Sequence, residues 1–346
     1  MNRAEPQADD DLLALASRLA GNANFGKARN LARLAGGKNN QVFRVETDAG
    51  TPLVLKRYFV DPRDPRDRLR AEWEFLQHAW SRGIHAIPQP LARDHTAHAG
   101  LYSFVEGRKL LAGELKPGHV EAALDFVQAV NEKPRAALAP GSEACFSLAE
   151  HLATVERRVS RLATLDPAAP HLDEAQSFVL TRLRPAWAAV KSRLAADALA
   201  AGLSIDEPIG ADELCLSPSD FGFHNALIDE TGRITFLDFE YAGRDDPAKL
   251  VSDFFCQPEV PVPLSLHAHF IDRMERGLGL NSAGIERCRL LLDAYQIKWT
   301  CIILNDFLPL GATRRAYADA GTWAKRCAEQ LAKAEAKLAG LNASIT

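Results

Sequence analysis

The chain has 346 residues, of which 47% are hydrophobic and 25% charged, and its formal net charge is −4. This length is enough to bury a large core without disulfide staples. A net charge so close to zero argues against a nucleic-acid-binding protein and against a disordered acidic chain. The composition therefore indicates an ordinary globular protein with one large domain or two lobes.

The cysteines and the N-terminal segment indicate the cellular compartment of the protein. The six cysteines form no C-x-x-C pair and no cluster with histidines at metal-ligand spacing, so we expect reduced thiols in a cytoplasmic protein. The first twenty residues carry acids before their apolar part, unlike a secretion signal, and no run is long enough to span a membrane. We expect a monomer or weak homodimer without membrane or nucleic-acid partners. The cysteines are Cys145, Cys215, Cys256, Cys288, Cys301 and Cys327.

Strand-like segments and one helix are predicted for the first third of the chain. Two runs rich in β-branched residues, Gln41–Glu46 and Pro52–Tyr58, flank the turn-forming residues 47–50 and predict a hairpin. Apolar residues at helical spacing then predict a helix over Asp67–Trp80. Two further strand-like pieces follow at 87–94 and 101–107. This part of the chain should form a mixed sheet crossed by one helix.

From Lys109 onward the apolar residues recur mainly at helical spacing. One region interrupts this pattern, because two short strand-like runs, 225–229 and 233–239, flank the turn-forming residues 230–232. We predict an α+β, two-lobed fold with a small β-rich lobe at 1–105 and a large, mainly helical lobe at 106–346. The predicted helices are His119–Val130, Leu148–Leu162, Ala175–Leu203, Leu264–Gly277, Ile285–Leu308 and Thr313–Leu341.

The strongest chemical signal lies in and around the predicted hairpin of the second lobe. Asp220 and Asn225 fall in the loop before it, and Asp238 ends its second strand. Phosphoryl transfer from ATP needs a carboxylate beside the attacking hydroxyl and oxygen ligands for Mg²⁺. The Asp-x-x-x-x-Asn loop and the later Asp supply these three groups. Taken singly, each residue is more often a loop cap or a turn residue.

The segment resembles the aminoglycoside phosphotransferase and choline kinase family, whose loop reads H-G-D-x-x-x-x-N and whose next strand ends in I-D-[WF]-E. The matching residues here are Asp220, Asn225, and Asp238 with Glu240 two residues later. The resemblance implies a protein-kinase-like fold with ATP and Mg²⁺ as cofactors. It also implies that Asp220 orients or deprotonates the acceptor hydroxyl while Asn225 and Asp238 hold magnesium.

One departure from the family pattern opens an alternative. Pro218 and Ser219 replace the His-Gly pair before Asp220. The function implied is transfer of the γ-phosphoryl group of ATP to a hydroxyl of a small molecule, such as a sugar, an aminosugar or an amino alcohol. The alternative is a catalytically inactive, pseudokinase-like protein that binds nucleotide or serves as a scaffold.

Upstream, residues 36–45 begin with a pair of glycines, where a turn is expected, and continue as a predicted strand. Glycines at such a turn let backbone N–H groups approach phosphates without a Cβ in the way. The same residues are also typical of an ordinary hairpin turn. The stretch is similar to the family's nucleotide loop G-x-x-N-x-x-[YF]-x-V. On that resemblance Gly36, Gly37 and Asn40 are candidates for nucleotide binding.

The following strand offers a lysine for the phosphates. Lys56 and Arg57 point to opposite faces by strand alternation, and either could be the solvated one. The family resemblance favours Lys56, and it implies Glu72 on the next helix as its partner. Glu74 competes for that role; we prefer Glu72, because Phe75 and Leu76 then stand at its i+3 and i+4 positions.

Residues 101–107 resemble the hinge between the two lobes of the family. Backbone groups of an extended segment there would pair with the adenine edge, which makes Ser103 and Val105 candidates for nucleotide binding. His224 is expected to pack in the loop, since Asp220 already occupies the base's position. By the same resemblance the acceptor would meet residues of the helical lobe. The candidates are Tyr241, Asp293, Lys298, Trp299, Asn305 and Asp306.

Overall fold

The computed structural model describes residues 5–34, 40–62, 64–133, 138–309 and 320–343. The chain divides into two compact units. The first unit comprises 1–142 and 216–244, and the second comprises 143–215 and 245–346. Each unit combines segments that are distant in the sequence, and neither unit ends at residue 105. The lobe boundary expected between residues 105 and 106 therefore stays a prediction.

The first unit contains a five-stranded antiparallel sheet in the order β1-β2-β3-β5-β4. The predicted hairpin is confirmed, because β2 and β3 pair on either side of the expected turn. The sequence did not reveal the first strand or the helix before it. The strands are β1 (Ala28–Arg33), β2 (Gln41–Thr47), β3 (Leu53–Arg57), β4 (Pro90–Asp94) and β5 (Ala99–Ser103).

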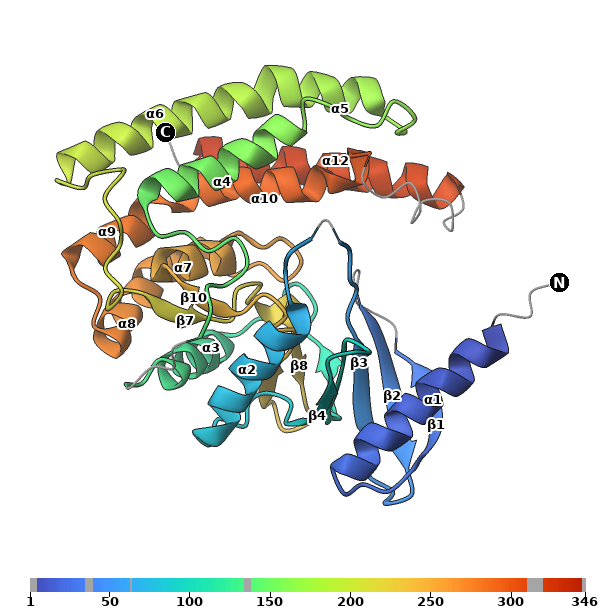
Figure 1. Cartoon of the computed structure of the whole chain (residues 1–346). Coiled ribbons are helices and arrows are strands. Elements are labelled where there is room, and N and C mark those ends of the chain that lie inside the picture. Colours follow the sequence, from blue (N-terminus) through green and yellow to red (C-terminus); the bar gives the residue numbers. More distant parts are fainter. Residues whose placement is uncertain (1–4, 35–39, 63, 134–137, 310–319, 344–346) are drawn as a thin grey trace. The chain divides into compact units, whose positions relative to one another are not determined.

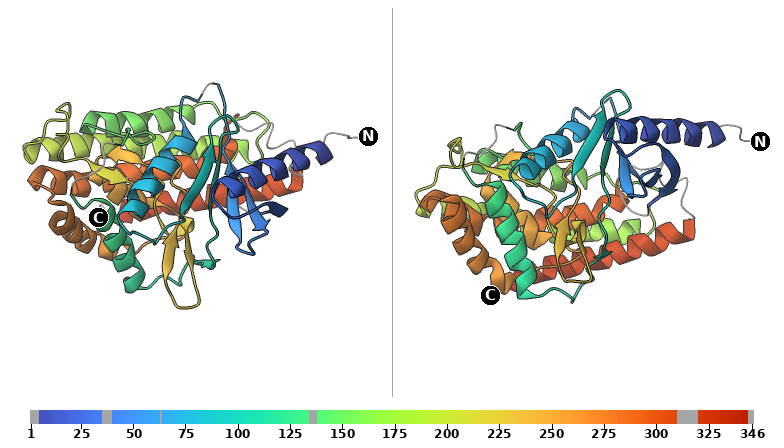
Figure 2. Two further views of the ribbon diagram at one scale, coloured as in Figure 1. Left: turned by 60° about the horizontal axis from the view of Figure 1, so that its bottom comes forward. Right: turned by 90° about the horizontal axis from the view of Figure 1, so that it is seen from below.

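Helix α1 (Glu5–Asn22) covers one face of this sheet (Figures 1 and 2). Its buried residues include Leu12 and Leu19, which pack with Val45, Leu55 and Leu101 from the strands. Because strand side chains alternate between faces, this apolar face fixes the orientation of each strand. Residues on the opposite face, Lys56 among them, therefore point toward the other side of the sheet.

Helix α2 (Arg68–Ser81) lies on that other side and confirms the predicted helix. Its first turn is capped by Asp67, whose side chain accepts a hydrogen bond of 3.0 Å from the backbone N–H of Arg70. Phe75 and Leu76 are fully buried, as expected for the residues behind Glu72. The packing of these two side chains directs Glu72 into the protein interior.

The second predicted hairpin is also present in the first unit. Strands β8 (Ala226–Ile228) and β9 (Ile234–Phe236) pair antiparallel, and β6 (Arg108–Lys109) joins them on the β8 side. A 3-10 turn, η2 (Phe223–Asn225), precedes β8. Helix α3 (Pro117–Val130) also belongs to this unit, and β7 (Cys215–Ser217) pairs with β10 (Gly243–Asp245) where the chain passes between the units.

An aromatic cluster holds the hairpin and the loop before it. Phe126 of α3 lies 5.6 Å from Phe221 and 5.0 Å from Phe236 between ring centroids. Phe239, just after the hairpin, stacks on Phe75 of α2 with centroids 4.8 Å apart. Such ring pairs contribute about 0.5–1.5 kcal/mol each beyond the area they bury. The loop at 218–225 is thus anchored by buried rings on both sides.

The second unit is helical, as predicted, and α4, α6, α10 and α12 run side by side in it (Figures 1 and 2). The long helix expected over 175–203 is interrupted, because residues Val179–Leu183 form a π-helical turn. The described helices are α4 (Leu148–Arg161), α5 (Leu172–Phe178), α6 (Arg184–Ala200), α7 (Pro247–Cys256), α8 (His267–Leu278), α9 (Ser282–Leu290), α10 (Leu292–Ile303) and α12 (Ala320–Ala343), with 3-10 turns at Leu264–Leu266 and Leu304–Phe307.

All six cysteines lie in described parts of the chain, and each is buried and outside any disulfide. The expectation of unbridged core thiols is therefore confirmed. None of the helices in the described ranges combines the length and the hydropathy that a bilayer span needs.

Charged groups are buried inside the second unit. His151 of α4 is fully buried, with Nδ1 2.7 Å from the Tyr295 hydroxyl and Nε2 3.2 Å from Asp246 Oδ2. Arg287 donates to the same aspartate over 2.9 Å. Burial lowers the pKa of His151, but Cys145 and Asp246 outweigh it and raise this pKa to about 9. A protonated His151 can donate from both ring nitrogens, which suits both contacts.

His151 should make stability depend on pH. Its pKa in the folded chain, about 9, exceeds the ordinary value of 6.5. The stabilisation is therefore fully present below pH 6.5 and is lost as pH rises through 9. The free energy of unfolding should fall by on the order of 3 kcal/mol over this range. Urea unfolding of wild type and His151→Gln across this range measures the effect, and the variant should show a flatter profile. Cys145→Ser is the control, and it should move the loss to lower pH. Equal slopes in wild type and His151→Gln would refute the assignment.

Candidate active site

The ammonium group of Lys56 is the centre of a charge cluster in the first unit. Its Nζ lies 2.6 Å from Glu72 Oε2 on α2 and 2.6 Å from Asp238 Oδ1 after β9. Lys56 is 8% exposed and Glu72 is 4% exposed. Burial lowers the pKa of Lys56, but Asp238, Glu72 and Glu240 together raise it above its ordinary value. Lys56 is therefore a cation whose position is fixed by two carboxylates.

This arrangement resolves two alternatives left open by the sequence. Lys56 is buried on the α2 face, whereas Arg57 is exposed. Glu72 contacts Lys56, and Glu74 is only partly buried on the same helix. The structure thus brings together the lysine and the glutamate expected from the sequence.

Asn225 and Asp238 lie at the same end of the hairpin. The register pairs Ala226 with Phe236, and one step further the N–H of Leu237 donates to the carbonyl of Asn225 over 2.8 Å. Asn225 Nδ2 donates to the backbone carbonyl of Asp220 over 2.9 Å. Because an N–H group must face that carbonyl, the amide oxygen of Asn225 is the end left for another partner.

Asp220 is the third member of the expected set. Its carboxylate is 38% exposed, and Oδ1 lies 3.2 Å from His224 Nε2. The expected packing of His224 in the loop therefore places its ring against this carboxylate. Sequence reasoning missed this contact, since the i, i+4 spacing brings the two side chains together only through the 3-10 turn at 223–225.

Two residues at the site have left-handed backbone conformations. Ser219 has φ +68° and Asp238 has φ +66°. A non-glycine residue in this region costs roughly 1–2 kcal/mol, although aspartate tolerates it better than most. The loop closes around Ser219, because its N–H donates to Ser217 Oγ over 3.0 Å and its carbonyl accepts from Phe221 over 2.6 Å. Ser219 thus occupies a conformation suited to the glycine that the family motif carries there.

The nucleotide-loop candidates are only partly described. Gly36 and Gly37 lie outside the described residues. Asn40 is 7% exposed; its Nδ2 donates to Glu240 Oε2, and its Oδ1 accepts from the N–H of Phe59 over 3.3 Å. Both ends of the Asn40 amide are thus engaged within the protein. Its side chain ties the end of β3 to the segment after Asp238.

The hinge candidates lie at the end of β5. Ser103 exchanges two bonds with Gln89: its N–H donates to the Gln89 carbonyl over 3.0 Å, and its Oγ accepts from the Gln89 N–H over 2.8 Å. Val105 follows, partly buried. Gly107 has φ +146°, and a Cβ there would meet the Ile228 carbonyl at 2.9 Å. A glycine is therefore required where this segment approaches β8.

Most acceptor candidates are engaged in contacts inside their own unit. Tyr241 of the first unit lies beneath the guanidinium groups of Arg66 and Arg68, at 5.3 and 5.8 Å from its ring centroid. In the second unit Lys298 and Trp299 both donate to Asp253 over 2.8 Å. Asp293 forms an ion pair with Arg193, and Asp306 forms one with Arg326. Asn305 is exposed.

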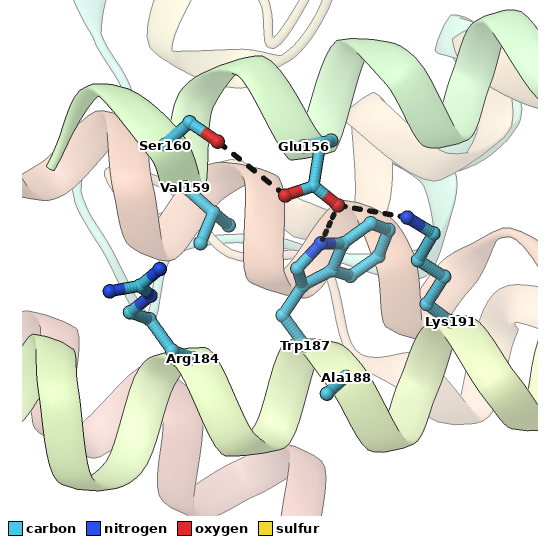
Figure 3. Close-up of a pocket in the computed structure, with 7 residues that line it drawn as sticks. All are labelled: Glu156, Val159, Ser160, Arg184, Trp187, Ala188 and Lys191. Atoms are coloured by element: carbon cyan, nitrogen blue, oxygen red, sulfur yellow. Dashed lines mark hydrogen bonds and ion pairs between the residues drawn. The ribbon is translucent and has the colours of Figure 1, made fainter. Parts of the chain in front are cut away.

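A surface pocket of about 290 Å³ lies between α4 and α6 of the second unit (Figure 3). Its polar centre is Glu156, which accepts hydrogen bonds from Trp187 Nε1 over 2.9 Å and from Lys191 over 3.0 Å. These two donors, with Ser160 at 3.5 Å, satisfy the carboxylate from within the pocket wall. The pocket contains none of the candidate residues of the charge cluster.

The chain belongs to the phosphotransferase enzyme family, whose model matches residues 30–291. The kinase-like fold and the class of small-molecule phosphotransferases expected from the sequence are confirmed at the level of this family. A comparison with curated protein sequences gave no significant match.

Solved structures with the same fold span nearly the whole chain. A choline/ethanolamine kinase family protein from Mesorhizobium loti is 20% identical, with a TM-score of 0.53 over 97% of this chain and 98% of that one. Choline kinase LicA from Streptococcus pneumoniae is 15% identical, with a TM-score of 0.58 over 96% and 99%. A spectinomycin phosphotransferase in complex with ADP and spectinomycin is 14% identical, with a TM-score of 0.58 over 95% and 98%.

The strained conformation of Ser219 gives a stability prediction. Ser219→Gly should raise the free energy of unfolding by about 0.5–1 kcal/mol, because the relief of the left-handed conformation exceeds the entropy that glycine adds to the unfolded chain. Urea unfolding measures the change. Ser217→Gly, in the extended strand β7, is the comparison and should be destabilising. A lower stability of Ser219→Gly would show that the conformation carries no net strain.

The partner of Lys56 can be tested by a matched pair of variants on one helix. Glu72→Gln should destabilise the protein by about 2–4 kcal/mol, because it leaves a buried ammonium with one carboxylate fewer. Glu74→Gln changes the same functional group at a partly buried position and should stay within about 0.5 kcal/mol of wild type. Urea unfolding at neutral pH compares them. Equal losses would contradict the assignment of Glu72.

Proposed function

We propose that the protein transfers the γ-phosphoryl group of Mg·ATP to a hydroxyl of a small molecule. The observation that carries this proposal is the contact of one lysine with two carboxylates from distant parts of the chain. Lys56 meets Glu72 across 16 residues and Asp238 across 182 residues. A phosphate-binding lysine paired with a helix glutamate, beside a carboxylate that can hold magnesium, is the arrangement that kinase-like phosphoryl transfer requires.

Lys56 would contact the phosphates of the nucleotide. A buried ammonium held from two sides has few alternative positions, so little entropy is lost when the phosphates bind. Gly36, Gly37 and Asn40 belong to the loop proposed to cover the phosphates, with Asn40 acting through its backbone since its amide is already engaged. Ser103 and Val105 are proposed to meet the adenine.

The residues suited to Mg²⁺ are Asn225 and Asp238. Magnesium prefers oxygen ligands and usually keeps waters or phosphate oxygens beside one or two carboxylates. The Asn225 amide oxygen and the 36%-exposed Asp238 carboxylate fit this preference. Within the described ranges, no three His, Cys, Asp or Glu side chains gather into a metal site. The ion would neutralise phosphate charge during transfer.

Asp220 would act on the acceptor hydroxyl. Its partly exposed carboxylate can accept the hydroxyl proton and orient the oxygen toward the γ-phosphorus. The contact with His224 and the anchoring of the Asp220 carbonyl by Asn225 hold the loop in one conformation. This restraint supports the proposal that Asp220 is the catalytic residue.

The second candidate is a nucleotide-binding protein without turnover. The replacement of His-Gly by Pro218 and Ser219 is the observation that favours it. Against it, the loop keeps its internal hydrogen bonds around Ser219, and His224 supplies an imidazole contact to Asp220. We therefore favour an active enzyme. Its acceptor would be a sugar, an aminosugar, an amino alcohol or a similar alcohol. The buried free thiols agree with a cytoplasmic protein, and we propose a monomer or weak homodimer.

Replacement of Asp220 tests the proposal. Asp220→Asn should lower turnover by roughly 10²–10⁴-fold and leave nucleotide affinity within about threefold of wild type, because the carboxylate acts on the acceptor rather than on ATP. The measurement is ADP release from Mg·ATP across a panel of sugars, aminoglycosides, amino alcohols and nucleosides, with nucleotide binding measured in parallel.

Glu230→Gln is the control, because this exposed carboxylate lies in the turn of the same hairpin. It should behave as wild type. Turnover that survives Asp220→Asn would remove Asp220 from the mechanism. Nucleotide binding by wild type without turnover on any acceptor would favour the second candidate.

A further inference from the structure

Glu72 receives more hydrogen bonds than its pairing with Lys56 requires. Besides Lys56, its Oε2 accepts from the Tyr58 hydroxyl over 2.7 Å. Its other oxygen, Oε1, accepts from the backbone N–H of Phe239 over 3.4 Å. The carboxylate is thus fixed from the sheet and from the segment after Asp238.

The Tyr58 hydroxyl is itself held by a second phenol. The hydroxyl of Tyr102 on β5 lies 2.7 Å from it, and both tyrosines are at most 4% exposed. The Tyr102 ring also packs on Trp73 of α2, with centroids 6.3 Å apart. Both side chains therefore lie in a buried layer between the sheet and α2, where a hydrogen bond is stronger than in water.

Gly100 makes room for this contact. In the sheet register Lys56 is paired with Gly100, and Tyr102 is two residues further along β5. A Cβ at Gly100 would lie only 2.3 Å from the Tyr102 hydroxyl and 2.6 Å from its Cζ. The missing side chain opposite Lys56 thus lets the phenol of Tyr102 lean across the strand and reach Tyr58.

The direction of the hydrogen bonds follows from the chemistry of the groups. A carboxylate only accepts, so the Tyr58 hydroxyl must donate to Glu72. Its oxygen is then left to accept from Tyr102. Burial raises the pKa of Tyr58 and of Tyr102, so both phenols keep their protons. Tyr58 also lies beneath the Lys56 ammonium, 5.1 Å from Nζ to the ring centroid.

We infer that Tyr58 and Tyr102 form a hydroxyl relay whose function is to position Glu72, and through it Lys56, for the phosphates of the nucleotide. The link to nucleotide binding rests on the proposed function, whereas the relay itself does not. Tyr58 and Tyr102 are positioning residues, since neither contacts the reacting groups. The relay extends the charge cluster from three residues to five and connects β3, β5 and α2.

Nucleotide affinity should report the relay. Tyr58→Phe should weaken Mg·ADP binding, measured by calorimetry, by about tenfold, and Tyr102→Phe by about threefold, because a hydrogen bond to a charged group is stronger than one between neutral groups. In Glu72→Gln the same Tyr58→Phe change should have little further effect, because the group that it orients is already altered. Tyr295→Phe is the matched control: it removes a buried hydroxyl, the one beside His151, and should leave ADP affinity unchanged.

A urea-unfolding cycle of Tyr58→Phe and Glu72→Gln, without nucleotide, separates this inference from the proposed function. Non-additivity in the cycle, together with weaker ADP binding by Tyr58→Phe, supports both. Non-additivity in a wild type that binds no ADP supports the relay and overturns its assignment to nucleotide binding. Additive effects in the cycle, or unchanged ADP affinity in Tyr58→Phe at equal stability, overturn the relay.

Discussion

The burial of one ammonium group constrains the arrangement of the whole first unit. An unpaired charge inside a protein is very costly, so Lys56 can occupy its position only where carboxylates meet it. Glu72 comes from a helix and Asp238 from the end of a hairpin. Sheet, helix and hairpin must therefore assemble together for the buried charges of Lys56 and Glu72 to be stable. The same requirement gathers the groups suited to bind phosphates.

Part of this arrangement could be predicted from the sequence. Lys56, Glu72, Asn225 and Asp238 are predictable because each matches a residue of the family pattern, and Lys56 and Glu72 also lie in a predicted strand and a predicted helix. Most helices and both hairpins followed from apolar periodicity. Helix α1 and strand β1 did not, since the burial of Leu12 and Leu19 in α1 also depends on Leu55 and Leu101 from strands further along the chain.

Other features depend on pairings that periodicity does not encode. Tyr58 and Tyr102 meet only through the register of β3 with β5 and the absence of a side chain at Gly100. In the second unit, the adjacent residues Asp245 and Asp246 have separate partners. Asp245 accepts from Cys145 and Lys249, whereas Asp246 caps α7 and binds His151. The different roles of these two neighbouring aspartates are visible only in three dimensions.

The left-handed backbone of Asp238 has a consequence for how substitutions there should be understood. Few residue types other than glycine adopt φ near +66° at low cost, and aspartate and asparagine are among them. Two separate demands, one from the main chain and one from the side-chain oxygens, thus select the same amino acid. In a mutational scan, nearly every substitution of Asp238 would lower activity, and the whole loss would be assigned to the missing carboxylate. Only asparagine keeps the shape while altering the charge, so it alone separates the two demands.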